Sequence, residues 1–214
     1  MTRRRPSSRK PRQPASAKAK GPGRLRLIGG DYRRRQLPVL DRPGLRPTPD
    51  RVRETLFNWL ATAVPGARVL DLFAGTGALG LEALSRGARQ AVFVERDAQV
   101  ARQLVDNLAA LGATERAQLV TADAQAYLAG APSPFSLVFL DPPFRLGLAG
   151  VCCRALEAGW LAEDALIYVE TESSLPPEVP ASWQLHREVR AGDSTGRLYR
   201  RHPPGAGSPG GDAC

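Results

Sequence analysis

The sequence predicts a doubly wound α/β domain with a mostly parallel sheet and a C-terminal antiparallel hairpin. Along the middle of the 214-residue chain, short apolar runs alternate with amphipathic stretches. Runs such as RVLDLF, AVFVE and SLVFLD are almost continuously apolar, which is typical of strands covered on both faces. Alternating strands and helices imply parallel strands joined by right-handed crossovers. Beyond residue 170, two strand-like runs flank a glycine-containing turn, which indicates a hairpin.

The elements of this domain can be assigned in order. A helix is expected to begin at Thr48-Pro49-Asp50, with Thr48 as its cap and Pro49 in its first turn, and to run to about Leu60. The five expected strands cover residues 68–72, 90–95, 117–121, 135–140 and 165–170. The helices between them cover residues 77–86, 97–111, 124–129 and 147–158. The hairpin strands cover residues 183–190 and 197–201, around a turn that contains Gly192 and Gly196.

Basic charge is concentrated at the N-terminus. The chain holds 30 Lys+Arg against 21 Asp+Glu, for a net charge of +9. Residues 1–35 hold 13 of the basic residues and one acid, so they carry +12 and the remainder carries −3. Such a block predicts an arm that binds a polyanion, with nucleic acid as the leading candidate. Residues 1–23 and 202–214 are expected to be disordered tails, which leaves residues 24–201 as a single domain.

The composition argues against several classes of protein. No run of about 18 apolar residues is present, so we expect no membrane-spanning helix. The Arg-rich start has no apolar segment behind it, which argues against a secretory signal, and its prolines argue against a transit peptide. Three cysteines and two isolated histidines predict neither a disulfide framework nor a metal site. We therefore expect a cytoplasmic protein without a metal.

A glycine-rich loop, DLFAGTG (71–77), follows the first expected strand and opens a helix. Ligands bind at this position in open α/β sheets, where glycines permit close backbone approach. The loop lacks the Gly-Lys-Ser/Thr of a Walker A motif, although from Gly75 it matches the dinucleotide fingerprint by its letters. Asp71 would repel a pyrophosphate, so the loop favours a ligand that carries positive charge. The alternative is a turn that serves only the fold.

Two more acids end or follow strands. Glu95 ends the second expected strand, where an acid can accept hydrogen bonds from both ribose hydroxyls. Asp123 follows the third strand and can accept from an adenine amino group. It is equally suited to cap the next helix, and the two roles are compatible.

The most specific motif is Asp141-Pro142-Pro143-Phe144, directly after the apolar run SLVFL. Prolines donate no N–H bonds, so nearby carbonyls stay available as acceptors. The Asp141 carboxylate and a backbone carbonyl together form a clamp for an amino group, and Phe144 offers a face on which a planar base can stack. A plain proline-rich turn would require neither the acid nor the aromatic residue.

Taken in order, DLFAGTG, Glu95, Asp123 and DPPF resemble class I S-adenosylmethionine-dependent methyltransferases that act on exocyclic amino groups. Segments 26–37, 45–60, 77–88 and 165–170 closely resemble the RsmD family, which is named for methylating guanine 966 of 16S rRNA at N2. The resemblance covers about residues 24–200. One departure is Arg33-Arg34-Arg35, where the family commonly reads Arg-Gly-Arg, and this puts the local turn in doubt.

The resemblance implies a Rossmann-like methyltransferase sheet and assigns roles to residues. The residues it implies for S-adenosylmethionine are Thr48, Asp71, Phe73, Ala74, Gly75, Thr76, Gly77, Glu95, Arg96, Asp123 and Ala124. Those implied for catalysis are Asp141, Pro142, Pro143 and Phe144. Those expected to contact RNA, from segment 24–47 and the following helix, are Arg24, Arg26, Arg33, Arg34, Arg35, Arg46, Arg51 and Arg53. For Arg51 and Arg53 a solvated helix face is an equal alternative.

The implied partner is 16S rRNA within an assembled or assembling small ribosomal subunit, bound by a monomer. Two rival functions stay open. One is the same chemistry on another amino group, such as adenine N6 in DNA or RNA or a protein glutamine, although these relatives more often carry Tyr or Trp at the position of Phe144. The other is a non-catalytic rRNA-binding assembly factor with the same fold.

Overall fold

The computed structural model describes residues 23–40, 42, 45, 48–144 and 146–202. The expected tails therefore lie almost wholly outside the described residues. Gly23, assigned to the N-terminal tail from the sequence, is instead the first residue of strand β1.

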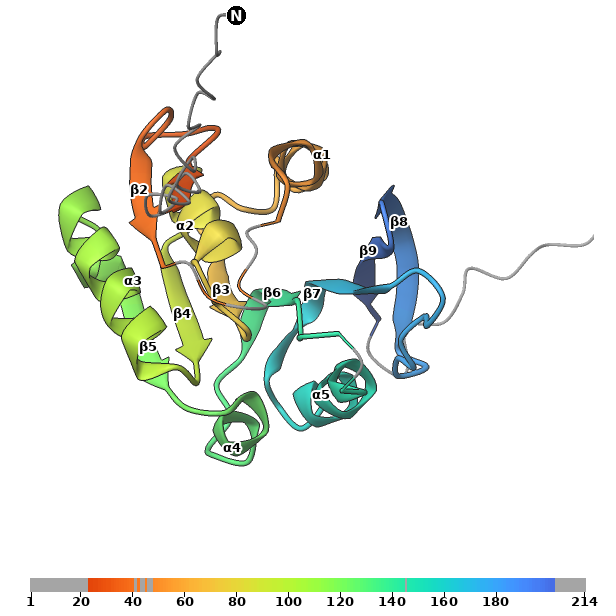
Figure 1. The fold of residues 1–214 in the computed structure, drawn as a ribbon. Helices are drawn as coiled ribbons and strands as arrows, with labels where there is room; N and C mark the ends of the chain where they lie inside the picture. The colour runs from red at the N-terminus through yellow and green to blue at the C-terminus, as the bar shows by residue number, and fades with distance from the viewer. Residues whose placement is uncertain (1–22, 41, 43–44, 46–47, 145, 203–214) are drawn as a thin grey trace, which may run out of the picture.

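A seven-stranded sheet forms the centre of the domain, in the order β5-β4-β3-β6-β7-β9-β8 (Figure 1). The first five strands in this order are parallel, and β9 is antiparallel to both β7 and β8. The strands are β3 (Arg68–Asp71), β4 (Gln90–Glu95), β5 (Ala117–Thr121), β6 (Phe135–Leu140), β7 (Leu161–Glu172), β8 (Trp183–Ala191) and β9 (Ser194–Arg201). The predicted fold class is confirmed, including the C-terminal hairpin.

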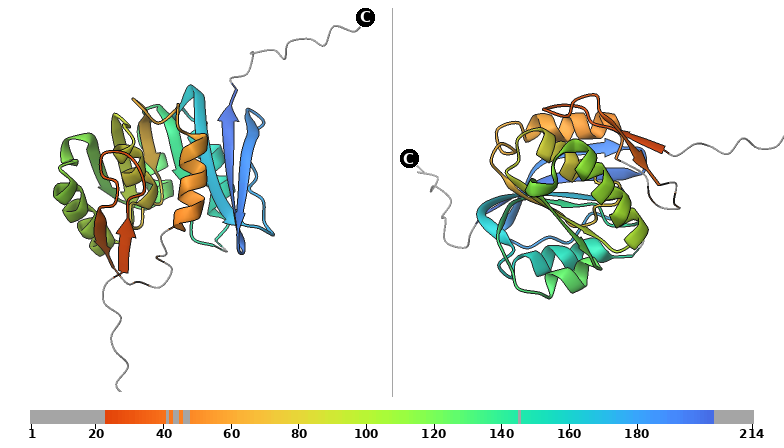
Figure 2. Two further views of the ribbon diagram at one scale, coloured as in Figure 1. Left: turned by 90° about the horizontal axis from the view of Figure 1, so that it is seen from above. Right: turned by 90° about the vertical axis from the view of Figure 1, so that its left-hand side faces the viewer.

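Helices cover both faces of the sheet (Figure 2). One face packs against α1 (Asp50–Trp59), α2 (Ala78–Ser85) and α3 (Ala98–Leu111), in a cluster that includes Phe57, Leu81 and Leu104. The other face packs against α4 (Ala124–Leu128) and α5 (Leu148–Leu156), in a cluster that includes both Cys152 and Cys153. A short 3₁₀ helix, η1 (Thr114–Arg116), leads into β5. The apolar runs recognised in the sequence are thus strands buried on both sides.

A two-stranded antiparallel hairpin precedes the main sheet and was not predicted. It consists of β1 (Gly23–Arg26) and β2 (Gln36–Val39), and it packs Leu25, Leu37 and Val39 into the first cluster. Each strand is only four residues long, and the exposed positions alternate with the buried ones. Such a short alternation between basic residues gives little signal in the sequence.

Several boundaries differ from the sequence prediction, among them the starts of α1, β7 and β9. Helix α1 begins at Asp50, Pro49 occupies the cap position, and no side chain caps it, so the prediction that Thr48 is the cap is wrong. Strand β7 begins at Leu161, four residues before the predicted start. The prediction missed these residues because Glu163 and Asp164 are polar and exposed, and they interrupt the apolar pattern. Gly196 lies inside β9 and not in the turn, which Gly192 makes with φ of 60°.

Candidate active site

Three acidic residues stand at the carboxyl ends of three neighbouring strands. Asp71 ends β3, Asp141 follows β6, and Glu170 lies near the end of β7. The chain leaves β3 toward β4 on one side, whereas β6 and β7 lie on the other side. The acids therefore flank the point where the strand order reverses, which is where open α/β sheets bind ligands.

Asp71 holds the glycine-rich loop against the start of α2. Its carboxylate is buried and accepts a hydrogen bond from the Gly80 N–H at 2.9 Å. Burial raises the pKa of Asp71 to about 7; the Gly80 N–H opposes this and the charge of Glu95 adds to it. A positive charge placed near Asp71 would favour the ionised form of its carboxylate and would lower its pKa.

The loop between Asp71 and α2 depends on its glycines. Gly77 has φ of 76°, and a Cβ at this position would lie 2.5 Å from Leu104 Cδ1 of α3. Leu45 lies over the other side of the loop, because a Cβ on Gly75 would come within 3.0 Å of its Cδ1. Leu45 thus covers part of the loop. Thr76 is buried in it, and Phe73 is partly exposed.

Glu95 supports this loop from β4. Its two carboxylate oxygens accept hydrogen bonds from the N–H groups of Gly75 and Asp97, each at 2.8 Å. The structure thus brings Glu95 and the loop together, as the spacing suggested. Each oxygen retains a further lone pair for a ligand, and the ribose role stays a prediction. Arg96, next in the chain, is exposed.

Asp123 caps α4, because its Oδ1 accepts from the Gln125 N–H at 2.8 Å. The capping interpretation is confirmed, and the proposed contact with adenine stays a prediction. Asp123 is exposed and Ala124 is buried at the start of the helix.

The DPPF loop leaves the end of β6. Asp141 is partly buried and Pro142 is buried, whereas Pro143 and Phe144 are exposed. Burial raises the pKa of Asp141 well above its ordinary value, and the nearby charges of Glu170 and Asp71 raise it further. Phe144 has 43% of its surface exposed, so its ring is available for stacking.

A cleft of about 360 Å³ lies beside this loop, lined by Pro142, Pro143, Glu170 and residues at the start of α5. Sequence reasoning missed Glu170. Its carboxylate is buried and accepts hydrogen bonds from Tyr168 Oη at 2.9 Å and Ser194 Oγ at 2.8 Å. The run ALIYVE ends in an acid just as AVFVE ends in Glu95, and this parallel could have drawn attention to it.

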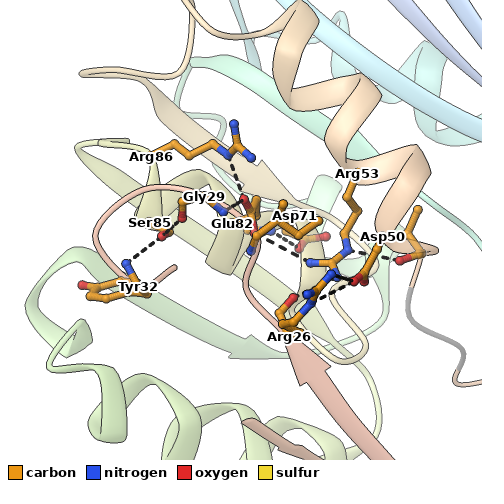
Figure 3. A network of polar contacts seen from close by, with 12 residues as sticks. Arg26, Gly29, Tyr32, Asp50, Arg53, Asp71, Glu82, Ser85 and Arg86 are labelled. Atoms are coloured by element: carbon orange, nitrogen blue, oxygen red, sulfur yellow. Dashed lines mark hydrogen bonds and ion pairs between the residues drawn. The ribbon is translucent and has the colours of Figure 1, made fainter. Parts of the chain in front are cut away.

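The structure removes Arg53 from the predicted RNA-binding set (Figure 3). Its side chain is 1% exposed and lies in the network between α1, α2 and β1. It donates hydrogen bonds to the carbonyls of Thr48 (3.1 Å) and Arg26 (2.9 Å) and to Asp50 Oδ1 (2.6 Å). Both predictions for Arg53, the RNA contact and the solvated face, are therefore wrong, because the guanidinium is buried and forms hydrogen bonds to other parts of the domain.

The other basic candidates are arranged differently. Those exposed at the surface are Arg24, Arg26, Arg33, Arg34, Arg35 and Arg51. Arg26 pairs with Asp50 at 2.8 Å, and Arg35 donates to the Ala110 carbonyl at 2.7 Å. Arg46 lies outside the described residues. Thr48 is buried beside the start of α1, three residues after Leu45.

Within the residues that the structure describes, no helix combines the length and apolar character needed to cross a bilayer. Over the same residues, no group of three or more His, Cys, Asp or Glu side chains is placed to hold a metal ion.

The sheet order, the glycine-rich loop after β3 and the DPPF loop after β6 define a Rossmann-like methyltransferase. The family model described as Conserved hypothetical protein 95 matches residues 25–200. The chain belongs to this family, which is the RsmD family that the motifs resemble.

Similar proteins agree with this assignment. The chain is 54% identical to Ribosomal RNA small subunit methyltransferase D of Escherichia coli, over 86% of this chain and 94% of that protein. It is 46% identical to the protein of the same name from Haemophilus influenzae, over 83% and 94%. The solved structure of yhhF from Escherichia coli has a TM-score of 0.78 and 54% identity, covering 84% of this chain and 99% of that one.

Proposed function

We propose that the protein transfers the methyl group of S-adenosylmethionine to the exocyclic N2 amino group of a guanine in 16S rRNA, at position 966. The observation that carries this proposal is the placement of the buried Asp71 and the DPPF loop at the ends of adjacent strands, β3 and β6. The relatives named above are rRNA small subunit methyltransferases, which supports rRNA as the substrate.

The residues present fit S-adenosylmethionine. The ligand would bring positive charge near Asp71, whose pKa of about 7 reflects burial without a compensating cation. Glu95 retains acceptor capacity for ribose hydroxyls, and exposed Asp123 for an adenine amino group. When bound, the cofactor supplies a methyl group already activated by its sulfonium.

The DPPF loop suits an exocyclic amino group. The lone pair of guanine N2 is delocalised into the ring and must be turned toward the methyl group. Acceptors at Asp141 and the Pro142 carbonyl would hold the two amino hydrogens and favour that orientation. Charge develops on the nitrogen as it attacks, and the Asp141 carboxylate would stabilise it. Phe144 would stack on a base taken out of its helix.

The exposed arginines of the N-terminal hairpin would bind phosphates around the target. Arg24, Arg33 and Arg34 are exposed there, and no described acid forms an ion pair with any of them. Such contacts add affinity that falls with salt and do not choose the nucleotide. The choice of nucleotide would therefore rest with the DPPF loop.

The test is transfer of tritium from labelled cofactor to small ribosomal subunits, to naked 16S rRNA and to DNA, followed by nuclease digestion of the labelled product. We expect label in N2-methylguanosine, from position 966. Label in N6-methyladenosine would refute the choice of guanine. Binding of rRNA with no transfer on any of these substrates would refute an enzyme and favour an assembly factor. Comparison of subunits with naked rRNA identifies the particle on which the protein acts.

A further inference from the structure

Asp141 and Glu170 stand next to each other across β6 and β7. Leu140 pairs with Val169 in this parallel ladder, and each is followed by an acid: Asp141 directly after β6, and Glu170 on β7. Neighbouring strands lie about 4.8 Å apart. Phe139 and Tyr168, two residues earlier on each strand, pack together with ring centroids 6.5 Å apart on the face that α1 covers. Alternation along β7 directs Glu170 toward that same face, and Asp141 directly follows β6 beside it.

The position of Glu170 is fixed by its surroundings. Its side chain is 6% exposed and accepts hydrogen bonds from Tyr168 Oη and Ser194 Oγ. Gly196 makes room for the Tyr168 hydroxyl, because a Cβ on Gly196 would lie 2.0 Å from it. Across the described residues, no arginine or lysine forms an ion pair with Glu170. Because the Glu170 carboxylate is hydrogen-bonded to two hydroxyls and is not paired with a described cation, its negative charge is not neutralised and acts on the neighbouring Asp141.

We propose that Glu170 is a positioning residue that acts through Asp141 and makes the Asp141 carboxylate the acceptor of the proton that the target amino group releases. This inference rests on the proposed function. Glu170 lines the cleft together with Pro142 and Pro143, so it lies beside the loop that would hold the amino group.

The proton transfer completes the balance of the reaction. The amino nitrogen forms a bond to the methyl carbon, the electron pair of the methyl–sulfur bond stays on sulfur, and the nitrogen releases one proton to an Asp141 oxygen. The ionisable groups that act on Asp141 are Asp71 from β3 and Glu170 from β7, with Tyr168 beside Glu170. Burial, together with the negative charges of Glu170 and Asp71, holds the pKa of Asp141 high. A more basic carboxylate takes up a proton more readily.

The Glu170→Gln variant removes the charge and keeps the size of the side chain. In protein labelled with carbon-13 at aspartate, without cofactor or RNA, we expect the pKa of Asp141 to fall, because a like charge beside it is removed. In methyl transfer, we expect the acidic limb of the kcat profile to move to lower pH, with KM for S-adenosylmethionine unchanged. The matched control is Glu163→Gln, an exposed acid at the other end of β7, which should leave both readouts unchanged.

The outcomes separate the inference from the function. Normal transfer by Glu170→Gln, with an unchanged Asp141 titration and pH profile, overturns the role of Glu170 alone. No transfer by the wild-type protein on any rRNA substrate refutes the proposed function. If Glu170→Gln does not fold, Tyr168→Phe removes one of the two bonds that fix the carboxylate, and a smaller shift in the same direction is expected. Loss of stability in Tyr168→Phe without any shift would show a purely structural role and overturn the inference.

Discussion

Arg53 on α1 and Glu82 on α2 lie 3.7 Å apart (Nη1 to Oε2), with both side chains almost completely buried. Glu82 also accepts hydrogen bonds from the N–H groups of Ile28 and Gly29, each at 2.8 Å, and from Arg86 Nε at 2.7 Å. The pair therefore joins the N-terminal hairpin, α1 and α2. Because α2 also supplies the Gly80 N–H that binds Asp71, the same network supports the glycine-rich loop.

Replacing Arg53 by alanine should destabilise the protein. The change leaves two backbone carbonyls and the charge of Glu82 with fewer partners, so we expect the free energy of unfolding to fall by about 3 kcal/mol. Urea unfolding followed by circular dichroism measures this. Arg51→Ala, at an exposed position of the same helix, should change the free energy by no more than about 0.5 kcal/mol. Equal effects of the two changes would contradict the structural role of Arg53.

Arg34→Gly should stabilise the hairpin loop. Arg34, the middle residue of Arg33-Arg34-Arg35, has φ of 69°, a left-handed conformation that glycine adopts without strain. We expect the free energy of unfolding to rise by up to about 1 kcal/mol. Thermal unfolding of Arg34→Gly and of Arg33→Gly tests this, since Arg33 has no positive φ to relieve. The prediction fails if the glycine at position 33 stabilises as much as that at position 34.

Asp71→Asn should change the pH dependence of stability. Burial raises the pKa of Asp71 from 3.8 to about 7, so the folded protein binds more protons than the unfolded chain between these values. Stability from this group is complete below the lower value and is lost as pH rises through about 7. The loss is up to about 4 kcal/mol for a shift of this size.

Asparagine does not ionise and can still accept from the Gly80 N–H. Without cofactor, Asp71→Asn should therefore melt at a higher temperature than the wild type at pH 8, and the difference should vanish near pH 4. Asp106→Asn, at an exposed position of α3, should show no such dependence. A constant difference at every pH would contradict the assignment to Asp71.

Glu95→Ala should weaken S-adenosylmethionine binding by tenfold or more, on the order of 1.4 kcal/mol. The variant loses the proposed ribose acceptor and also the two N–H bonds that hold Gly75 and Asp97. Isothermal calorimetry measures the affinity, with Asp106→Ala as the control on α3. Unchanged affinity in Glu95→Ala would refute the ribose assignment.

Asp141→Ala should retain cofactor binding and lose methyl transfer by about 10²-fold or more, because the stabilising charge acts on the reacting nitrogen. Binding is followed by calorimetry and transfer by tritium incorporation into small ribosomal subunits. Near-normal turnover would exclude this role for Asp141. Loss of cofactor affinity in parallel would place Asp141 in the cofactor site instead.

Much of the central sheet could be predicted from the sequence, because strands β3, β4 and β6 are buried on both faces and therefore read as apolar runs. Strands β4, β5 and β6 have the predicted bounds. The acids at the strand ends could be found for the same reason. Asp71 ends one apolar run and Asp141 follows another, and the end of such a run indicates the end of a strand.

What escaped prediction depends on contacts between distant segments. Arg53 reads as one of several arginines, and its burial follows only from the approach of Arg26, Asp50 and Glu82 in space. Glu170 gains its importance from Asp141 on the neighbouring strand and from Ser194 on the last strand. Neither relation is local in the chain, so no periodicity or spacing reports it.

Strand β9 follows β8 in the chain and yet lies between β7 and β8. Glu170 faces Gly196 in this ladder, and the Ser194 hydroxyl reaches it from the same strand. A nascent chain that ends at β8 does not yet contain β9. Strand β8 cannot join the sheet without β9, because β7 and β8 do not pair with each other directly. The ladder around Glu170 can therefore be completed only after β9 has been synthesised and has inserted between β7 and β8.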